Sequence, residues 1–172
     1  MSGEASTRVR FRTIGVSDPA LEPEGLRFVT VRGTALRGRG DITLAPDTTS
    51  NEFVLWSHPK AAGYTPSALV HQGRVYLVHD TGIMVVLAAD SGREIYKARV
   101  GGVGHTFSAS PIATADRIYF PDEEGVTIVL APGDQYREIA QNDLGEMTLA
   151  SPAVSGNALF VRTARKLYRI QQ

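Results

Sequence analysis

The chain repeats itself three times, and this self-similarity restricts its fold more than any other feature. The copies begin at Ser67, Ser110 and Ser151, so the second follows the first by 43 residues and the third follows the second by 41. Each serine is followed, eight and nine positions later, by an aliphatic and an aromatic residue: Val75 with Tyr76, Ile118 with Tyr119, and Leu159 with Phe160. A repeat of about 40 residues that is rich in β-branched side chains is typical of a four-stranded propeller blade.

Short β-rich runs alternate with turn residues inside each copy. The predicted strands are 67–71, 74–79, 83–88 and 94–99 in the first copy, 110–114, 117–122, 126–130 and 135–140 in the second, and 151–155, 158–163 and 167–170 in the third. The 17 glycines and nine prolines lie at turn spacing, and no long window keeps a helical period. We therefore expect an all-β fold, a partial β-propeller of about three to four four-stranded antiparallel blades.

Two regions differ in how clearly they show this pattern. Residues 61–172 hold the three blade repeats, at about 65–100, 108–142 and 149–172. Residues 1–60 are looser, with strands expected at 8–14, 26–31 and 53–56, the last as the outer strand of a preceding blade. The polar stretch 34–51 reads as a loop with one short strand around Ile42.

The charge and composition exclude several classes of protein. Lysine plus arginine and aspartate plus glutamate each number 18, which argues against a nucleic-acid or membrane-surface binder. The longest apolar runs reach about seven residues, and roughly 18 are needed to span a bilayer. The absence of cysteine excludes disulfides and thiolate metal sites. The first residues also lack the apolar stretch of a signal peptide, so the sequence does not assign a compartment.

Residues 87–96, LAADSGREIY, resemble the repeat signature of pyrroloquinoline-quinone-like (PQQ-like) β-propellers, L-x-A-x-D-x-x-T-G-x-x-x-W, with a shorter turn and Tyr96 in place of tryptophan. The Ser-Pro pairs at Ser110 and Ser151, each followed by a strand, are similar too. The whole stretch from about Gly38 to Ile170 resembles the C-terminal half of a bacterial quinoprotein-like propeller.

The points at which the chain departs from this family pattern favour a non-catalytic role. PQQ-dependent dehydrogenases of this architecture use paired cysteines, a calcium-binding Glu–Asn–Asp set and stacking tryptophans, whereas this chain has no cysteine and one tryptophan. We therefore assign no catalytic, cofactor or metal residues and expect neither PQQ nor calcium. The favoured function is a scaffold or protein-interaction segment, as in the propeller scaffolds of the bacterial periplasm or envelope. The alternatives are a PQQ-dependent oxidoreductase domain and a sensor or carbohydrate-binding propeller attached to a larger enzyme.

One loop is the best candidate for a ligand-binding site. Gly101, Gly102, Gly104 and His105 form a glycine-rich connection that leads into the innermost strand of the next blade, and such connections line one face of a propeller. The loop lacks the Lys-Ser/Thr pair and the helix of a phosphate-binding loop. The other histidines, at positions 58, 71 and 79, have no metal-ligand spacing.

Two further patterns have structural interpretations. The acidic turn 122–125 (DEEG) is either a solvated hairpin turn, which we favour, or a site for a hard cation, although it lacks the spacing of a calcium loop. Ser110 and Ser151 recur at equivalent positions, which favours hydrogen bonding at the start of a strand over catalysis.

Partners are expected at the blade edges. Full propellers of this kind have seven or eight blades, and a partial ring would leave apolar faces and strand edges open to water. We therefore expect a protein partner or self-association through blade edges, unless the strands at 8–14 and 26–31 cover one end.

Overall fold

The computed structural model describes residues 28–31, 44–51, 54–58 and 63–171. They fall into two compact units, residues 1–61 with 90–92, and residues 62–89 with 93–172. In the first unit, β1 (Phe28–Val31) and β2 (Val54–His58) pair antiparallel. Residues 44–51 form no strand, and the strands expected at 8–14 and around Ile42 lie outside the described residues. The assignment of β2 to a preceding blade stays a prediction.

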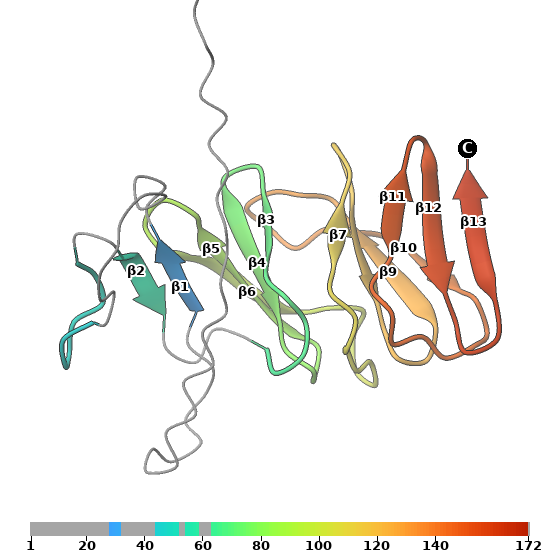
Figure 1. Cartoon of the computed structure of the whole chain (residues 1–172), viewed down its shortest axis with the longest axis horizontal. Coiled ribbons are helices and arrows are strands. Elements are labelled where there is room, and N and C mark those ends of the chain that lie inside the picture. The colour runs from blue at the N-terminus through green and yellow to red at the C-terminus, as the bar shows by residue number, and fades with distance from the viewer. Residues whose placement is uncertain (1–27, 32–43, 52–53, 59–62, 172) are drawn as a thin grey trace, which may run out of the picture. The chain divides into compact units, whose positions relative to one another are not determined.

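The second unit consists of three antiparallel sheets whose strands follow one another in chain order (Figure 1). The first blade contains β3 (Leu69–His71), β4 (Arg74–Val78), β5 (Ile83–Ala88) and β6 (Glu94–Arg99). The second blade contains β7 (Ile112–Ala113), β8 (Ile118–Pro121), β9 (Val126–Leu130) and β10 (Glu138–Asp143). The third blade contains β11 (Ala153–Ser155), β12 (Ala158–Arg162) and β13 (Leu167–Gln171). The described residues contain no helix, so the all-β prediction is confirmed.

One strand was placed wrongly by the sequence. β10 begins at Glu138, three residues later than the expected strand 135–140. Before β10, the backbone makes an excursion away from the sheet. A hydrogen bond from the N–H of Ala131 to the carbonyl of Arg137 closes this excursion. Within this excursion the Tyr136 hydroxyl accepts the N–H of Gly101, 35 residues earlier. A side chain that is committed to a distant contact delays the return of the chain to the sheet.

The three blades share one strand register. Tyr76 faces Leu69 across the first hairpin, Tyr119 faces Ile112 in the second, and Phe160 faces Ala153 in the third. Because neighbouring residues of a strand point to opposite faces, Val75, Ile118 and Leu159 share one face of their blades and the aromatic residues share the other. This prediction from the repeat is confirmed.

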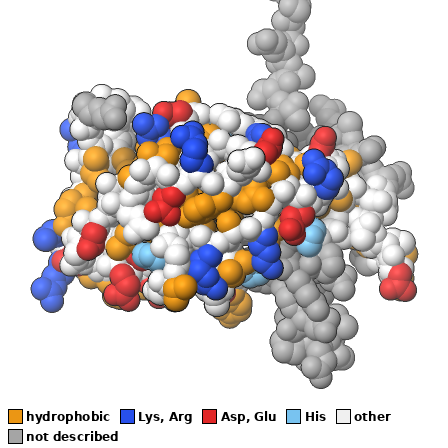
Figure 2. All heavy atoms as spheres, turned by 180° about the vertical axis from the view of Figure 1, so that it is seen from behind, with side chains coloured by type: hydrophobic (Ala, Val, Ile, Leu, Met, Phe, Trp, Pro, Cys, Tyr) orange, Lys and Arg blue, Asp and Glu red, His pale blue; other side chains and the backbone are white. Residues whose placement is uncertain are grey.

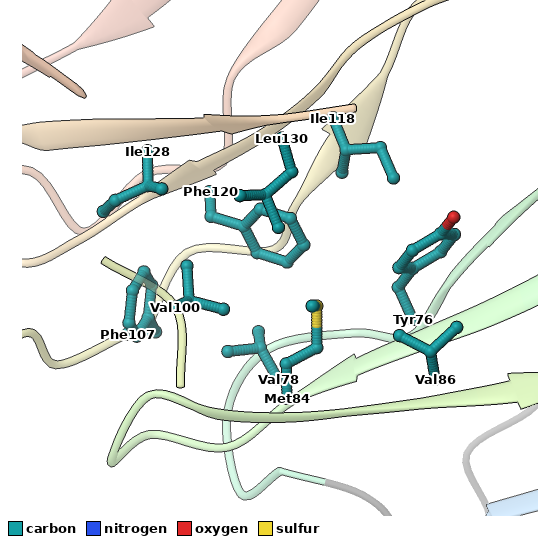
Figure 3. Packing of buried hydrophobic residues seen from close by; sticks show 10 residues of the cluster. All are labelled: Tyr76, Val78, Met84, Val86, Val100, Phe107, Ile118, Phe120, Ile128 and Leu130. Carbon is teal, nitrogen blue, oxygen red and sulfur yellow. The ribbon is translucent and has the colours of Figure 1, made fainter. Parts of the chain in front are cut away.

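The first and second blades pack face to face through a common core (Figure 3). Its ten buried side chains come from β4 and β5, from β8 and β9, and from the connection between the blades: Tyr76, Val78, Met84, Val86, Val100, Phe107, Ile118, Phe120, Ile128 and Leu130. None of them is more than 1% exposed. Burying each large apolar side chain stabilises the fold by about 1.5–3 kcal/mol, so this interface is a principal source of stability for the unit.

Candidate functional site

The predicted ligand loop is the connection between β6 and β7. Gly101, Gly102 and Gly104 have φ angles of 70°, 96° and 100°, in the left-handed region that only glycine adopts without strain. A Cβ atom on Gly101 would lie 2.8 Å from Cγ1 of Ile128 and 2.9 Å from Cδ2 of His105. Glycine at position 101 therefore lets the connection pass close against the second blade, whereas Gly102 and Gly104 are exposed.

His105 is turned inward and paired. Its Nδ1 lies 2.6 Å from Oδ2 of Asp122, and the two side chains are 17% and 1% exposed. Because a carboxylate only accepts hydrogen bonds, the imidazole donates its Nδ1–H. The pair joins the connection to the β8–β9 turn. The structure thus gives the histidine of the predicted loop a definite structural contact.

Asp122 corrects the expectation of a solvated turn. Its Oδ1 accepts the N–H of Gly125 at 2.9 Å and the N–H of Val126 at 2.7 Å. With His105 on the other oxygen, three donors satisfy the carboxylate, which is what makes the burial of a charged group tolerable. The interpretation as a solvated turn is wrong for Asp122, although Glu124 is exposed. An aspartate that begins a turn and bonds the backbone a few residues on is a known local signal.

A second carboxylate of the acidic turn, that of Glu123, also accepts a hydrogen bond. Ser108 Oγ donates to Oε1 of Glu123, again linking the connection to the turn. Among the residues that the structure describes, no three histidine or acidic side chains lie close enough together to hold a metal ion. The turn therefore acts as an anchor for the connection.

An equivalent hydrogen bond between a connection and a turn is found one blade further on, made by different side chains. Glu146 precedes Thr163 by 17 residues, the separation between His105 and Asp122. Thr163 Oγ1 donates to Oε2 of Glu146, and the N–H of Arg165 donates to the same oxygen at 3.1 Å. The hydrogen bond from Thr163, followed by that from Arg165, lowers the pKa of Glu146. A position that joins connection to turn in both blades, whatever its side chains, has a structural role.

Backbone hydrogen bonds run alongside these side-chain links. The N–H of Phe107 donates to the carbonyl of Asp80, in the turn of the first blade, and Thr106 accepts from the N–H of Glu123, in the turn of the second. The next connection repeats this pattern, because Thr148 donates to the Glu123 carbonyl and Met147 accepts from Ala164. Each connection is therefore held between the turns of two successive blades, and both connections lie at the same edge of the blades.

The recurring serines join the innermost strands. Ser110 Oγ accepts the N–H of Ser67, and Ser151 Oγ accepts the N–H of Ser110, each at 2.9 Å. The expected hydrogen bonding at the start of each strand is confirmed, and it runs from blade to blade.

A cluster of tyrosines, which the sequence did not single out, closes the outer part of the first interface. Tyr76 and Tyr96 both pair with Val86 across neighbouring strands and so share a face. Burial raises the pKa of Tyr96 well above its ordinary value, and burial, with the hydrogen bond to Glu138, raises the pKa of Tyr136 to about 12. Among the residues that the structure describes, the buried hydroxyl of Tyr96 has no hydrogen-bond partner.

A cavity, also missed from the sequence, lies between the second and third blades. It has a volume of about 650 Å³, within the range of ligand sites. Its walls include Arg117, which directly precedes β8, and residues of β8, β9, β12 and β13, among them Tyr119, Thr127, Leu159, Val161 and Ile170.

Comparison with known proteins supports the fold. No protein-family model matches the chain, and no curated protein matches its sequence. Among solved structures, BamB from Moraxella catarrhalis is similar at 17% identity and a TM-score of 0.55, over 69% of this chain and 37% of BamB. A quinohemoprotein alcohol dehydrogenase from Pseudomonas putida matches at 13% identity and a TM-score of 0.49, over 63% of this chain and 24% of the enzyme. A europium-containing methanol dehydrogenase matches at 15% identity and a TM-score of 0.41, over 51% of this chain and 18% of the enzyme.

Successive antiparallel blades, packed face to face and joined by short connections, define the chain as a segment of a β-propeller. The match to BamB shows a similar fold. The chain has the fold of part of a PQQ-like β-propeller, as the sequence predicts, and it spans little more than a third of the length of BamB. None of the described residues forms a helix long and apolar enough to cross a membrane.

Proposed function

We propose that the chain is a non-catalytic propeller scaffold that binds a protein partner through its connection face, the edge formed by residues 101–109 and 144–150. The observation that carries the proposal is the contrast between polar and apolar side chains at this edge. His105 and Ser108 are bonded to the adjoining turn. Val103, Met147 and Leu149, by contrast, are 90%, 52% and 55% exposed. Polar groups that fix a shape and apolar groups that face water are the features of an interaction surface.

Exposed apolar side chains also lie between charged ones on the face in Figure 2. Single residues of this kind are ordinary on a protein surface, so the grouping of three on two connections that share one edge is what supports the proposal. The likeness to BamB supports the propeller frame on which the connections are built.

The residues at this edge do not fit a PQQ and calcium site. The oxygens of Asp122 and Glu123 that would serve a cation accept hydrogen bonds from His105, Ser108 and backbone amides. No observation therefore favours an oxidoreductase over a scaffold.

Affinity capture with the whole chain tests the proposal. The tagged chain is incubated with a bacterial envelope extract, beside a Val103→Asp/Met147→Asp variant and an Ile139→Asp control. Ile139 is 42% exposed on β10, away from the connections. We expect a partner that the parent and the control retain and that the double variant loses. Equal capture by all three chains, or a rise in melting temperature on adding PQQ with calcium, would contradict the proposal.

A further inference from the structure

The connection face displays Val103 from a loop that is anchored on both sides. The side chain of Val103 is 90% exposed. Two residues before it, the N–H of Gly101 donates to the hydroxyl of Tyr136 at 3.0 Å. Two residues after it, Nδ1 of His105 lies 2.6 Å from Oδ2 of Asp122. Because the second blade holds both sides of the loop, a partner that covers Val103 has little of the chain left to immobilise, which favours binding.

The glycines on either side of Val103 fix the conformation of this loop. A Cβ atom at Gly102 or Gly104 would meet no atom within 4 Å beyond its chain neighbours, so lack of space does not explain these glycines. Their φ angles of 96° and 100° explain them, because other residues are strained in that region. The two glycines therefore stabilise a backbone conformation in which an apolar side chain faces water.

Backbone hydrogen bonds between neighbouring elements give their order along this edge. In sequence, the elements are turn 79–82, connection 101–109, turn 122–125, connection 144–150 and turn 163–166. Val103 thus belongs to the connection between the first and second turns. Met147 and Leu149 belong to the connection between the second and third turns. Each exposed apolar side chain of the face is therefore flanked by two turns, and the side chains of those turns determine the charge around it.

Acidic side chains gather on the elements around Val103. Residues 79–82, 101–109, 122–125 and 143–150 contain six acidic side chains and no lysine or arginine. The six are Asp80, Asp122, Glu123, Glu124, Asp143 and Glu146. The whole chain contains 18 acidic and 18 basic side chains, so this excess is a local property of the connection face. A surface with one sign of charge favours a partner with the other.

Two of these six carboxylates are available to a partner. The other four accept hydrogen bonds within the protein: Asp122, Glu123, Asp143 and Glu146. Asp80 and Glu124 are exposed, and neither side chain forms a hydrogen bond or an ion pair with another residue that the structure describes. Arg99 adds one basic group beside the first turn, where its guanidinium donates to the carbonyl of Thr81 at 2.7 Å.

The third turn limits the acidic region on one side. It carries Arg165 and Lys166, both exposed, and no acidic side chain. A basic partner is therefore attracted to the first two turns and repelled from the third. The acidic excess also opposes contact with a membrane surface, whose anionic lipids attract basic segments. This charge pattern favours a basic segment of polypeptide as the occupant.

We propose that the partner of the connection face is a segment of polypeptide in which basic residues flank apolar ones. An apolar side chain of the segment covers Val103, and its basic side chains pair with Asp80 and Glu124, on the turns that flank this connection. The inference rests on the proposed function, because it concerns the same surface, and it adds the chemistry of the partner. Buried apolar anchors provide most of the affinity of an interface, whereas charges at its rim provide specificity and fast association.

Two fluorescent peptides test this chemistry. The peptides GKRLVLRKG and GEDLVLDEG share an apolar centre and differ in the sign of their charge. Each is titrated into the whole chain, and its anisotropy is recorded. We expect the basic peptide to bind at least about tenfold more tightly than the acidic one. Raising the ionic strength from about 0.05 to about 0.5 M should weaken this binding, because salt screens exposed charges.

Variants of the chain locate the binding site. Asp80→Asn/Glu124→Gln removes two negative charges with little change of shape and should weaken binding of the basic peptide by about five- to tenfold. The matched control, Glu94→Gln/Asp116→Asn, removes two negative charges at the opposite edge of the blades and should leave the affinity within about twofold. Val103→Asn removes the apolar contact without a change of charge and should weaken binding by about tenfold. The melting temperature of each variant checks that it is folded.

The proposal is overturned if the basic peptide binds no more tightly than the acidic one, or if Asp80→Asn/Glu124→Gln binds it as the parent does. Competition by phosphatidylglycerol vesicles for the same site would assign the face to a membrane and overturn it too. Affinity capture from the envelope extract separates this inference from the proposed function. A partner that Asp80→Asn/Glu124→Gln retains and that Val103→Asp/Met147→Asp loses would refute the basic chemistry and leave the scaffold function supported.

Discussion

Replacing Asp122 with alanine tests whether the buried pair with His105 anchors the connection to the second blade. The change removes the acceptor of three donors, the imidazole of His105 and the amides of Gly125 and Val126. Leaving a buried donor without a partner costs about 1–3 kcal/mol, and removing one member of a buried pair costs about 3–5 kcal/mol. We therefore expect the free energy of unfolding to fall by about 3–5 kcal/mol, a large part of the roughly 5–15 kcal/mol of a typical domain.

Urea unfolding followed by far-ultraviolet circular dichroism measures this loss. Glu124→Ala is the matched control, because Glu124 is an exposed residue of the same turn and its loss should cost less than about 0.5 kcal/mol. A double-mutant cycle with His105→Ala should give a coupling energy of about 0.5–3 kcal/mol. If Asp122→Ala unfolds at the urea concentration of Glu124→Ala, the carboxylate is solvated and the anchoring argument fails.

The remaining predictions concern the core, the serines and the tyrosines. Ile118→Ala should lower the free energy of unfolding by about 2–5 kcal/mol, because it leaves a void between two blades; an unchanged urea midpoint would show that the position is not packed. Ser110→Ala should cost about 0.5–1.5 kcal/mol in the same assay, since the N–H of Ser67 loses its acceptor, and Ser110→Thr should retain most of the stability. Stability should fall as the pH rises from about 10 toward 12, because the unfolded chain loses the tyrosine protons near the ordinary pKa of 10.0 while folded Tyr136 keeps its proton to about 12. Urea midpoints across that range, with a smaller decline in Tyr136→Phe, check the sign.

Much of the fold could be predicted from the sequence because the relevant signals are local. Alternating side chains and turn residues predicted β5, β6 and β9 with their observed bounds. The equivalent positions of Val75 and Ile118 followed from counting residues after each serine. β10 was misplaced because its start depends on a contact between Tyr136 and Gly101, which no local pattern reports.

The candidate site could be predicted only in part. The glycine-rich connection and His105 were recognised from their place between two blades, but the partner of His105 was not. Asp122 looked solvated because its neighbours in the chain are acidic, whereas its burial depends on donors that the fold brings to it. The low exposure of a charged side chain is a property of the surrounding structure, and the residue type alone argues against it.

By itself, then, the sequence determined the repeat, the strand order and the shared face of Val75, Ile118 and Leu159, since these depend on residues close together in the chain. Only the tertiary structure decided which groups satisfy Asp122 and whether the space between two blades is filled. Phe120 and Val161 occupy equivalent places in the repeat, and both are apolar residues suited to a strand. The difference in their volumes becomes a cavity only when two sheets are packed against each other, because packing density is a property of both surfaces together.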